Sequence, residues 1–434
     1  MNFYRLYIIS MSLLFIGVGV SIPAEVAAEQ VVQIAKNSSY SCRREHNAGA
    51  YAGDYTFVCW AGPLMMPYVK MYDHASKAWS KSVMIDPRPL EKRTKADYHY
   101  YPVLVVGGDK HLYVFREGDY YRSPRPLDVR GEWSHGQPAA RTRTGVRYPA
   151  PLVDTTGNIY VFYRFGASHG STGGYAKSSD NGQNWEVHQN AIAGQLWGRP
   201  HGFYLMHTVY EPAQNDKPER LHLTWFLRKK RHENVYFVYF LPGPDRFESV
   251  DGSNLGQRIT EREREAHCVV ETVSSAHWQI LSHFTEEGNP VVVCDSKSDK
   301  IICAAWNGDE WKSYPTPFAR FTTQGWQPGP RAKDIEKIGA KAFRIYCKDP
   351  RQPHHIVWYE TQDSGKTWAK SGQLQLPVPD FLQATVLDNN PAQIRLLIKQ
   401  NNPRVHRKMR YMGTNRILVL ESPGELPQSS AAER

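Results

Sequence analysis

Residues 178–185 read SSDNGQNW, and residues 361–368 read TQDSGKTW. In both stretches an Asp stands two residues before a Gly, and a Trp closes the stretch. An Asp side chain can tie a tight turn through hydrogen bonds, and Gly tolerates the positive φ that such a turn requires. The shared pattern therefore predicts a locked β-hairpin at each place, with its Trp packed between strands.

The closing Trp belongs to a longer series of strand-rich segments. The series runs through Trp79, Trp133, Trp185, Phe247, Trp311 and Trp368, in steps of 54, 52, 62, 64 and 57 residues. Seven modules fit the chain, starting near His46, His99, Tyr148, Arg199, His267, Trp326 and Phe381. Because radial repetition hides sheet edges in a long all-β chain, we expect a seven-bladed β-propeller. The stretches at 178–185 and 361–368 would be its Asp-box hairpins. No convincing amphipathic helix interrupts the pattern.

The two ends of the chain differ from this repeat. Arg5 precedes an apolar run from Leu6 to Val20, and small residues follow at positions 26–28. This order is typical of a signal peptide, and the run is shorter than the roughly 20 residues of a membrane span. We therefore expect a signal peptide over residues 1–28, a propeller over residues 29–420, a polar tail over residues 421–434, and a secreted or periplasmic protein.

The charge indicates the kind of partner. The formal net charge is +10, and loss of residues 1–28 leaves it unchanged, since that segment carries one cation and one anion, Arg5 and Glu25. A basic exported protein favours an anionic partner. No arginine-rich helix or zinc-finger spacing supports nucleic acid as that partner.

The six cysteines form no CxxC pair. They therefore predict buried thiols or one or two disulfides, and no zinc site. We expect no cofactor, although a structural cation such as calcium would fit a propeller channel.

Three residues near blade openings and strand ends could together remove a proton from a uronic acid. The C5 proton of a uronate becomes acidic only when the neighbouring carboxylate is neutralised, which the fork of Arg164 can do. A general base needs a pKa near the working pH, which suits the imidazole of His99, and Tyr148 could donate a proton to the leaving oxygen. Which of the two is base and which is acid stays open.

At these residues the chain resembles the BNR-repeat propeller polysaccharide lyases, which comprise ulvan lyases and rhamnose-glucuronate lyases. The resemblance rests on a blade-opening His99, on the pair Tyr148-Pro149, and on an Arg sixteen residues after that Tyr. It implies β-elimination at a rhamnose-α-1,4-glucuronate linkage. The ulvan lyases carry a second His about twenty residues after the first, where this chain has Asp119-Tyr120-Tyr121, so a gum or arabinogalactan side chain is the other candidate substrate.

Further candidates for substrate binding lie at comparable positions of other blades. Five residues are expected to hold uronate or sulfate groups at the channel mouth: His46, Arg199, His201, Arg228 and Arg331. Cationic side chains at the ends of successive strands would converge there and attract an acidic glycan.

Two other functions remain open. Related propellers include α-L-rhamnosidases whose working His lies in the first blade, so His46 could instead serve a hydrolase. The usual carboxylate pair of a glycosidase is not evident in the sequence. A non-catalytic propeller that binds acidic glycans through its many aromatic rings is the third candidate.

Overall fold

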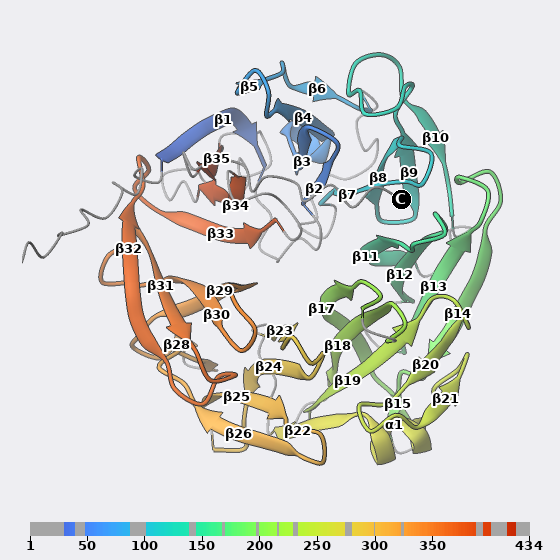
Figure 1. Ribbon diagram of the computed structural model, residues 1–434, viewed down its shortest axis with the longest axis vertical. Coiled ribbons are helices and arrows are strands. Elements are labelled where there is room, and N and C mark those ends of the chain that lie inside the picture. Colours follow the sequence, from blue (N-terminus) through green and yellow to red (C-terminus); the bar gives the residue numbers. More distant parts are fainter. Residues whose placement is uncertain are drawn as a thin grey trace, which may run out of the picture.

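The computed structural model of the chain describes residues 30–39, 48–86, 101–138, 145–166, 170–196, 199–214, 217–228, 233–273, 280–298, 300–322, 325–387, 394–400 and 415–421. Seven antiparallel sheets stand around a central axis like the blades of a propeller (Figure 1). This arrangement confirms the fold expected from the repeat.

The first three blades follow one another in sequence order. Blade one contains β2 (Gly49–Ala52), β3 (Tyr55–Ala61), β4 (Pro67–Asp73), β5 (Ala78–Trp79) and β6 (Val83–Met84), with a 3₁₀ turn at Pro63–Met65. Blade two contains β7 (Val103–Val106), β8 (Leu112–Arg116), β9 (Asp119–Arg122) and β10 (Ser134–Gly136). Blade three contains β11 (Val146–Val153), β12 (Ile159–Phe165), β13 (Thr172–Ser178) and β14 (Glu186–Ile192).

Blade four is the largest, and blades five and six return to four strands. Blade four contains β17 (Gly202–Glu211), β18 (Arg220–Arg228), β19 (Glu233–Leu241), β20 (Arg246–Glu248), β21 (Asn254–Gly256) and β22 (Val269–Val273). Blade five contains β23 (Leu281–Phe284), β24 (Pro290–Asp295), β25 (Ile301–Trp306) and β26 (Trp311–Pro315). Blade six contains β29 (Arg331–Lys337), β30 (Phe343–Lys348), β31 (His355–Thr361) and β32 (Ala369–Gln375). Two short hairpins precede blades four and six, namely β15 (Gln195–Leu196) with β16 (Arg199–Pro200), and β27 (Phe321–Thr322) with β28 (Gly325–Trp326).

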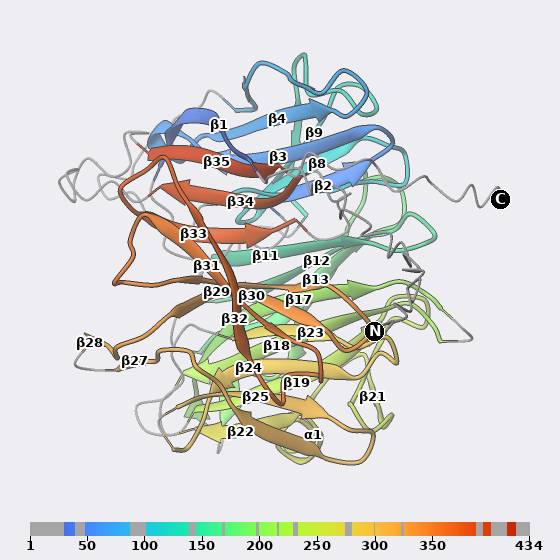
Figure 2. The same cartoon turned by 60° about the vertical axis from the view of Figure 1, so that its left-hand side comes forward.

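Blade seven joins the two ends of the described chain. It contains β33 (Phe381–Val386), β34 (Ile394–Gln400), β35 (Asn415–Glu421) and, on its outer edge, β1 (Gln30–Ser38). Figure 2 shows β1 beside β35 in this sheet. The Trp79 indole of blade one also donates a hydrogen bond to Glu421, at 2.9 Å. The segment before the first expected blade therefore closes the ring, a role that the repeat pattern alone did not predict.

The first strand of each blade lies nearest the axis (Figure 1). Each of these strands contacts the one that follows it in the series β2, β7, β11, β17, β23, β29 and β33. Apolar side chains fill the space between blades, so that all seven residues of β12 are buried. A strand covered on both faces reads as a continuous apolar run, which is how β12 reads in the sequence. Functional side chains can therefore emerge only near the strand ends.

The fifth blade starts at Leu281 rather than near His267. The seven-residue helix α1 (Glu261–His267) occupies the expected start, and Thr260 and Glu263 cap it reciprocally. The next strand, β22, pairs with Glu233–Tyr236 of β19 and so completes blade four. The prediction was wrong here because the fourth blade carries extra elements that mimic the opening of a new blade.

Both Asp-box stretches form locked turns. Asp180 accepts a hydrogen bond from the Asn184 amide at 2.8 Å, and the Trp185 indole donates to the carbonyl of Gly182 at 3.0 Å. Gly182 has a φ of +83°. The second stretch repeats these contacts at Asp363, Thr367, Trp368 and Gly365. Trp185 contacts Phe115 of blade two, and Trp368 contacts Phe318 in the segment that follows blade five and packs on a core cluster that includes blade-five residues. The locks therefore also join neighbouring blades.

The cysteines contribute to the core. Cys268, Cys294, Cys303 and Cys347 are buried free thiols, and Cys59 is buried too. Within the part of the chain that the structure describes, no helix has the length and apolar character needed to cross a membrane.

Candidate functional site

The structure brings together two of the three residues expected to carry the chemistry. Arg164 is the last residue but one of β12, and it lies opposite Arg147 of β11 in the register of blade three. Tyr148 follows Arg147 and starts a β-bulge in β11. The guanidinium carbon of Arg164 lies 4.6 Å from the centre of the Tyr148 ring. His99, the third residue, and His46 lie outside the described residues.

Tyr148 has a backbone conformation that is unusual for a residue with a side chain. Its φ is +58°, in the left-handed region, which costs roughly 1–2 kcal/mol for an L-residue other than Gly. Bulges re-aim side chains and are frequent beside active sites. The bulge thus places the Tyr148 ring over Arg164, and its strain is the kind that a functional position maintains.

A second aromatic ring completes the setting of Arg164. The guanidinium carbon lies 5.0 Å from the ring centre of Tyr204 on β17, and Tyr204 stacks on Phe226 at 5.1 Å. The exposed fraction of Arg164 is 3%, and Tyr148 and Tyr204 are buried as well. A cation held between aromatic faces and away from water interacts more strongly with an incoming anion than a solvated one does.

The equivalent Arg of blade two is already engaged by a carboxylate. Arg116 ends β8 as Arg164 approaches the end of β12, and its guanidinium lies 3.5 Å from Asp86. The Tyr121 hydroxyl also donates to Asp86, at 2.8 Å, and burial raises the pKa of Tyr121. At Asp119-Tyr120-Tyr121, where the resemblance led us to look for a second His, this chain therefore has a buried network of Arg116, Asp86 and Tyr121, and Arg116 also donates to the carbonyl of Met65 in blade one.

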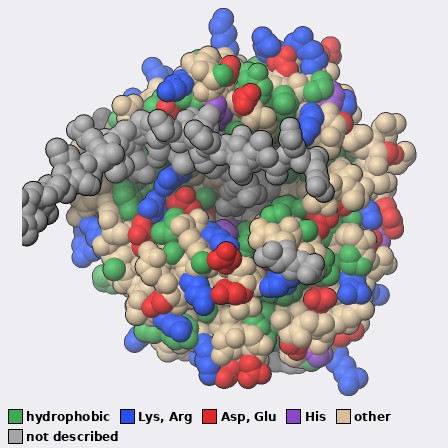
Figure 3. All heavy atoms as spheres, in the orientation of Figure 1, with side chains coloured by type: hydrophobic (Ala, Val, Ile, Leu, Met, Phe, Trp, Pro, Cys, Tyr) green, Lys and Arg blue, Asp and Glu red, His purple; other side chains and the backbone are tan. Residues whose placement is uncertain are grey.

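The remaining candidates are spread over blades four and six. His201 precedes β17 and is largely buried, and its carbonyl accepts hydrogen bonds from the amides of Gly170 and Ser171. Arg228 ends β18 opposite Gly202 and is exposed. Arg199 lies in β16, and its side chain is outside the described part. Arg331 opens β29 opposite Lys348, and burial lowers its pKa. Figure 3 shows Lys and Arg side chains interspersed with Asp and Glu around the ring on one face.

Tyr204 was not identified from the sequence as a candidate site residue. Its only signal is positional, because it lies near the start of the first strand of blade four, as Tyr148 does in blade three. Alignment of the blades with one another, rather than a search for motifs, could have found it.

Comparisons with known proteins identify a family and several relatives for this chain. A family model described as a BNR repeat-containing family member matches residues 55–319. An ulvan lyase of Nonlabens ulvanivorans is 23% identical over 428 residues, which cover 86% of each chain. An ulvan lyase of Alteromonas sp. (strain LOR) is 20% identical over 423 residues, covering 85% of this chain and 83% of that one.

Solved structures share the fold. A PL25 ulvan lyase bound to -[GlcA(1-4)Rha3S]- is 17% identical, with a TM-score of 0.71 over 91% of this chain and 96% of that chain. The polysaccharide lyase Uly1 is 10% identical, with a TM-score of 0.62 over 90% and 92% of the two chains. These relatives support the expectation of a polysaccharide lyase on a propeller scaffold.

Proposed function

This chain belongs to the BNR repeat-containing family, and we propose that it cleaves a uronic-acid-containing polysaccharide by β-elimination at a rhamnose-α-1,4-glucuronate linkage. The observation that carries this proposal is Arg164, buried between Tyr148 and Tyr204 beside a strained bulge. The ulvan lyases among the relatives, and the glucuronate–rhamnose ligand named for one solved structure, support the substrate class.

Arg164 would pair with the carboxylate of the glucuronate at the cleavage site. Its planar fork matches the two carboxylate oxygens, and neutralising their charge makes the C5 proton removable. Because the guanidinium is already desolvated and packed, little reorganisation is needed when the substrate arrives.

His99 and Tyr148 would divide the proton transfers. One takes the C5 proton, the electron pair of that bond forms the C4–C5 double bond, and the bond from C4 to the linking oxygen breaks. The other gives a proton to that oxygen, which leaves as the hydroxyl of the shortened chain. Protons and electrons balance whether His99 is the base and Tyr148 the acid or the reverse. In either case the strained bulge places Tyr148 beside Arg164.

Ultraviolet absorbance of the new double bond tests this function. Purified protein is mixed with ulvan, gum arabic and plain glucuronan in separate cuvettes. A rise with ulvan or gum supports the linkage, and the better substrate decides between them. Rhamnose release without absorbance would favour a hydrolase that uses His46, and binding without any product would favour a glycan-binding propeller. Export, which residues 1–28 predict, suits an enzyme acting on a polymer outside the cell.

A further inference from the structure

Blade six repeats the local geometry of the Arg164 site with a different set of side chains. The first strand of blade six, β29, has a bulge between Ala332 and Asp334, and Lys333 is the extra residue. Lys348, the last residue of β30, pairs with Arg331 as Arg164 pairs with Arg147 in blade three. Two blades on one side and three on the other separate blades three and six, so β11 and β29 lie on opposite sides of the central axis (Figure 1).

Three cations gather at this position around one carboxylate. The ammonium of Lys348 lies 2.5 Å from Asp380 and donates to the carbonyl of Phe381 at 3.0 Å. Asp380 also accepts from the Phe381 amide, at 2.9 Å. The carboxylate is thus committed to Lys348 and to the backbone, and Arg331 and Lys333 add two further positive charges.

Lys333 is the member of this group that is left for a ligand. Its side chain is partly exposed, and within the described part of the chain its ammonium makes no hydrogen bond or ion pair. An ammonium that is largely removed from water and set among like charges gains when an anion binds.

The backbone around Lys333 is fixed on both sides. The Gln383 amide group donates to the carbonyl of Lys333 at 3.4 Å, and the Val386 amide donates to Asp334 at 2.8 Å. These contacts join β29 to β33 of the next blade. The position of Lys333 is therefore held by the seam between blades six and seven, so that little ordering is needed when a ligand binds.

We propose that Lys333, with Arg331 and Lys348, forms a second anion subsite that holds another oxyanion group of the glycan while Arg164 holds the uronate that is cleaved. The inference rests on the proposed function. A sulfate ester and a further uronate carboxylate share the chemistry that this subsite recognises, because both present several oxygens to cations.

The pKa of Lys333 gives the subsite a pH dependence. This pKa is lowered to about 8, mainly by burial. The charges of Lys348 and Arg331 also lower it, and Asp380 and Cys347 raise it by less. A bound oxyanion favours the charged ammonium and raises the pKa. In the protein without ligand, Lys333 loses its charge as the pH rises above about 8, so affinity for the glycan should fall over that range.

Three variants test the subsite by steady-state kinetics on ulvan and on desulfated ulvan. Lys333→Met should raise KM about tenfold with little change in kcat, as expected for loss of one charged contact. Lys333→Arg should keep the low KM and abolish its rise at alkaline pH, because Arg stays protonated. Lys370→Met, which alters an exposed Lys on β32 of the same blade, is the matched control and should leave both constants unchanged.

The two polymers identify the group that binds. A tenfold effect on ulvan that disappears with desulfated ulvan assigns the subsite to sulfate, and an equal effect on both assigns it to a carboxylate. Unchanged KM in Lys333→Met on both polymers would overturn the subsite and leave the lyase function standing. If no polymer is cleaved, calorimetric binding of the same oligosaccharides tests the subsite separately, and equal affinity of the Lys333→Met and native proteins would refute it.

Discussion

The guanidinium of Arg164 lies over the ring of Tyr148, 4.6 Å from its centre, because a bulge in β11 turns Tyr148 toward the neighbouring strand. Replacing Arg164 with Ala should lower kcat by roughly 10²-fold or more, the usual loss when a preorganised charge partner of the transition state is removed. Absorbance of the unsaturated product measures this loss.

The control for this variant is Arg130→Ala, which removes an exposed guanidinium paired with Asp128 on the surface. It should retain full activity. Circular dichroism should show the same fold for both proteins. Near-native turnover by a folded Arg164→Ala protein would place the carboxylate site elsewhere in the ring.

Tyr148→Phe separates the hydroxyl from the ring. Phe keeps the aromatic face over Arg164 but removes the group that would transfer a proton, so kcat should fall about 10²-fold or more with little change in stability. Tyr163→Phe is the matched control on β12. The Tyr163 hydroxyl is buried without a hydrogen-bond partner among the described residues, so its removal should leave activity intact and stability equal or higher. Equal activity of the two variants would rule out a proton-transfer role for Tyr148.

The fold could be predicted because its signals are local. The Asp-boxes at 178–185 and 361–368 tie their turns through contacts within eight residues. The closing aromatics, from Trp79 to Trp368, stand in or just before the fourth strand of each of the first six blades. Closure of the ring by β1 could not be predicted this way, since β1 and β35 pair across almost the whole chain. The same holds for β22, whose partner β19 is selected by blade packing.

The site was only partly predictable for a similar reason. The spacing of Tyr148 and Arg164 indicated a shared site, and the register of β11 and β12 brings them together. Tyr204 and Lys333 carry no motif. Each becomes notable only through its neighbours, Arg164 for Tyr204 and Lys348 for Lys333.

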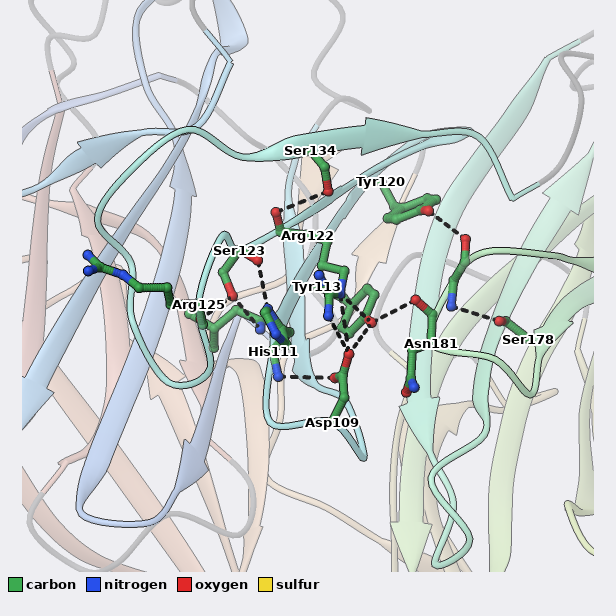
Figure 4. Close-up of polar contacts among 12 residues, drawn as sticks. Asp109, His111, Tyr113, Tyr120, Arg122, Ser123, Arg125, Ser134, Ser178 and Asn181 are labelled. Carbon is green, nitrogen blue, oxygen red and sulfur yellow. Dashed lines mark hydrogen bonds and ion pairs between the residues drawn. The ribbon is translucent and has the colours of Figure 1, made fainter.

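Tyr120→Phe tests the seam between blades two and three. The Tyr120 hydroxyl donates a 2.6 Å hydrogen bond to the carbonyl of Gly182, in the Asp-box of the next blade (Figure 4). That carbonyl also accepts from the Trp185 indole, so it keeps a partner in the variant. The free energy of unfolding should fall by about 0.5–1.5 kcal/mol with unchanged kcat. Urea unfolding measures the first quantity, and a larger loss would mean that the lock itself opens.

A buried His between blades four and five should make stability depend on pH. His222 is fully buried, its Nε2 lies 2.7 Å from Glu211, and Arg220 lies 2.6 Å from the same carboxylate. Burial lowers the pKa of His222 below its ordinary range, more than the neighbouring Glu211 raises it. Burial alone would raise the pKa of Glu211, but hydrogen bonds and charge from His222 and Arg220 lower it.

Both shifts act in the same direction. Below the ordinary pKa of His, about 6.5, the unfolded chain binds a proton that the folded chain does not, so stability falls with falling pH. The depressed pKa of Glu211 adds a further loss below about pH 4.5. We expect the melting temperature to drop between pH 7 and pH 5, and His222→Gln, which keeps an N–H donor but cannot titrate, to flatten that drop. An equally steep fall in the variant would assign the acid sensitivity to other groups.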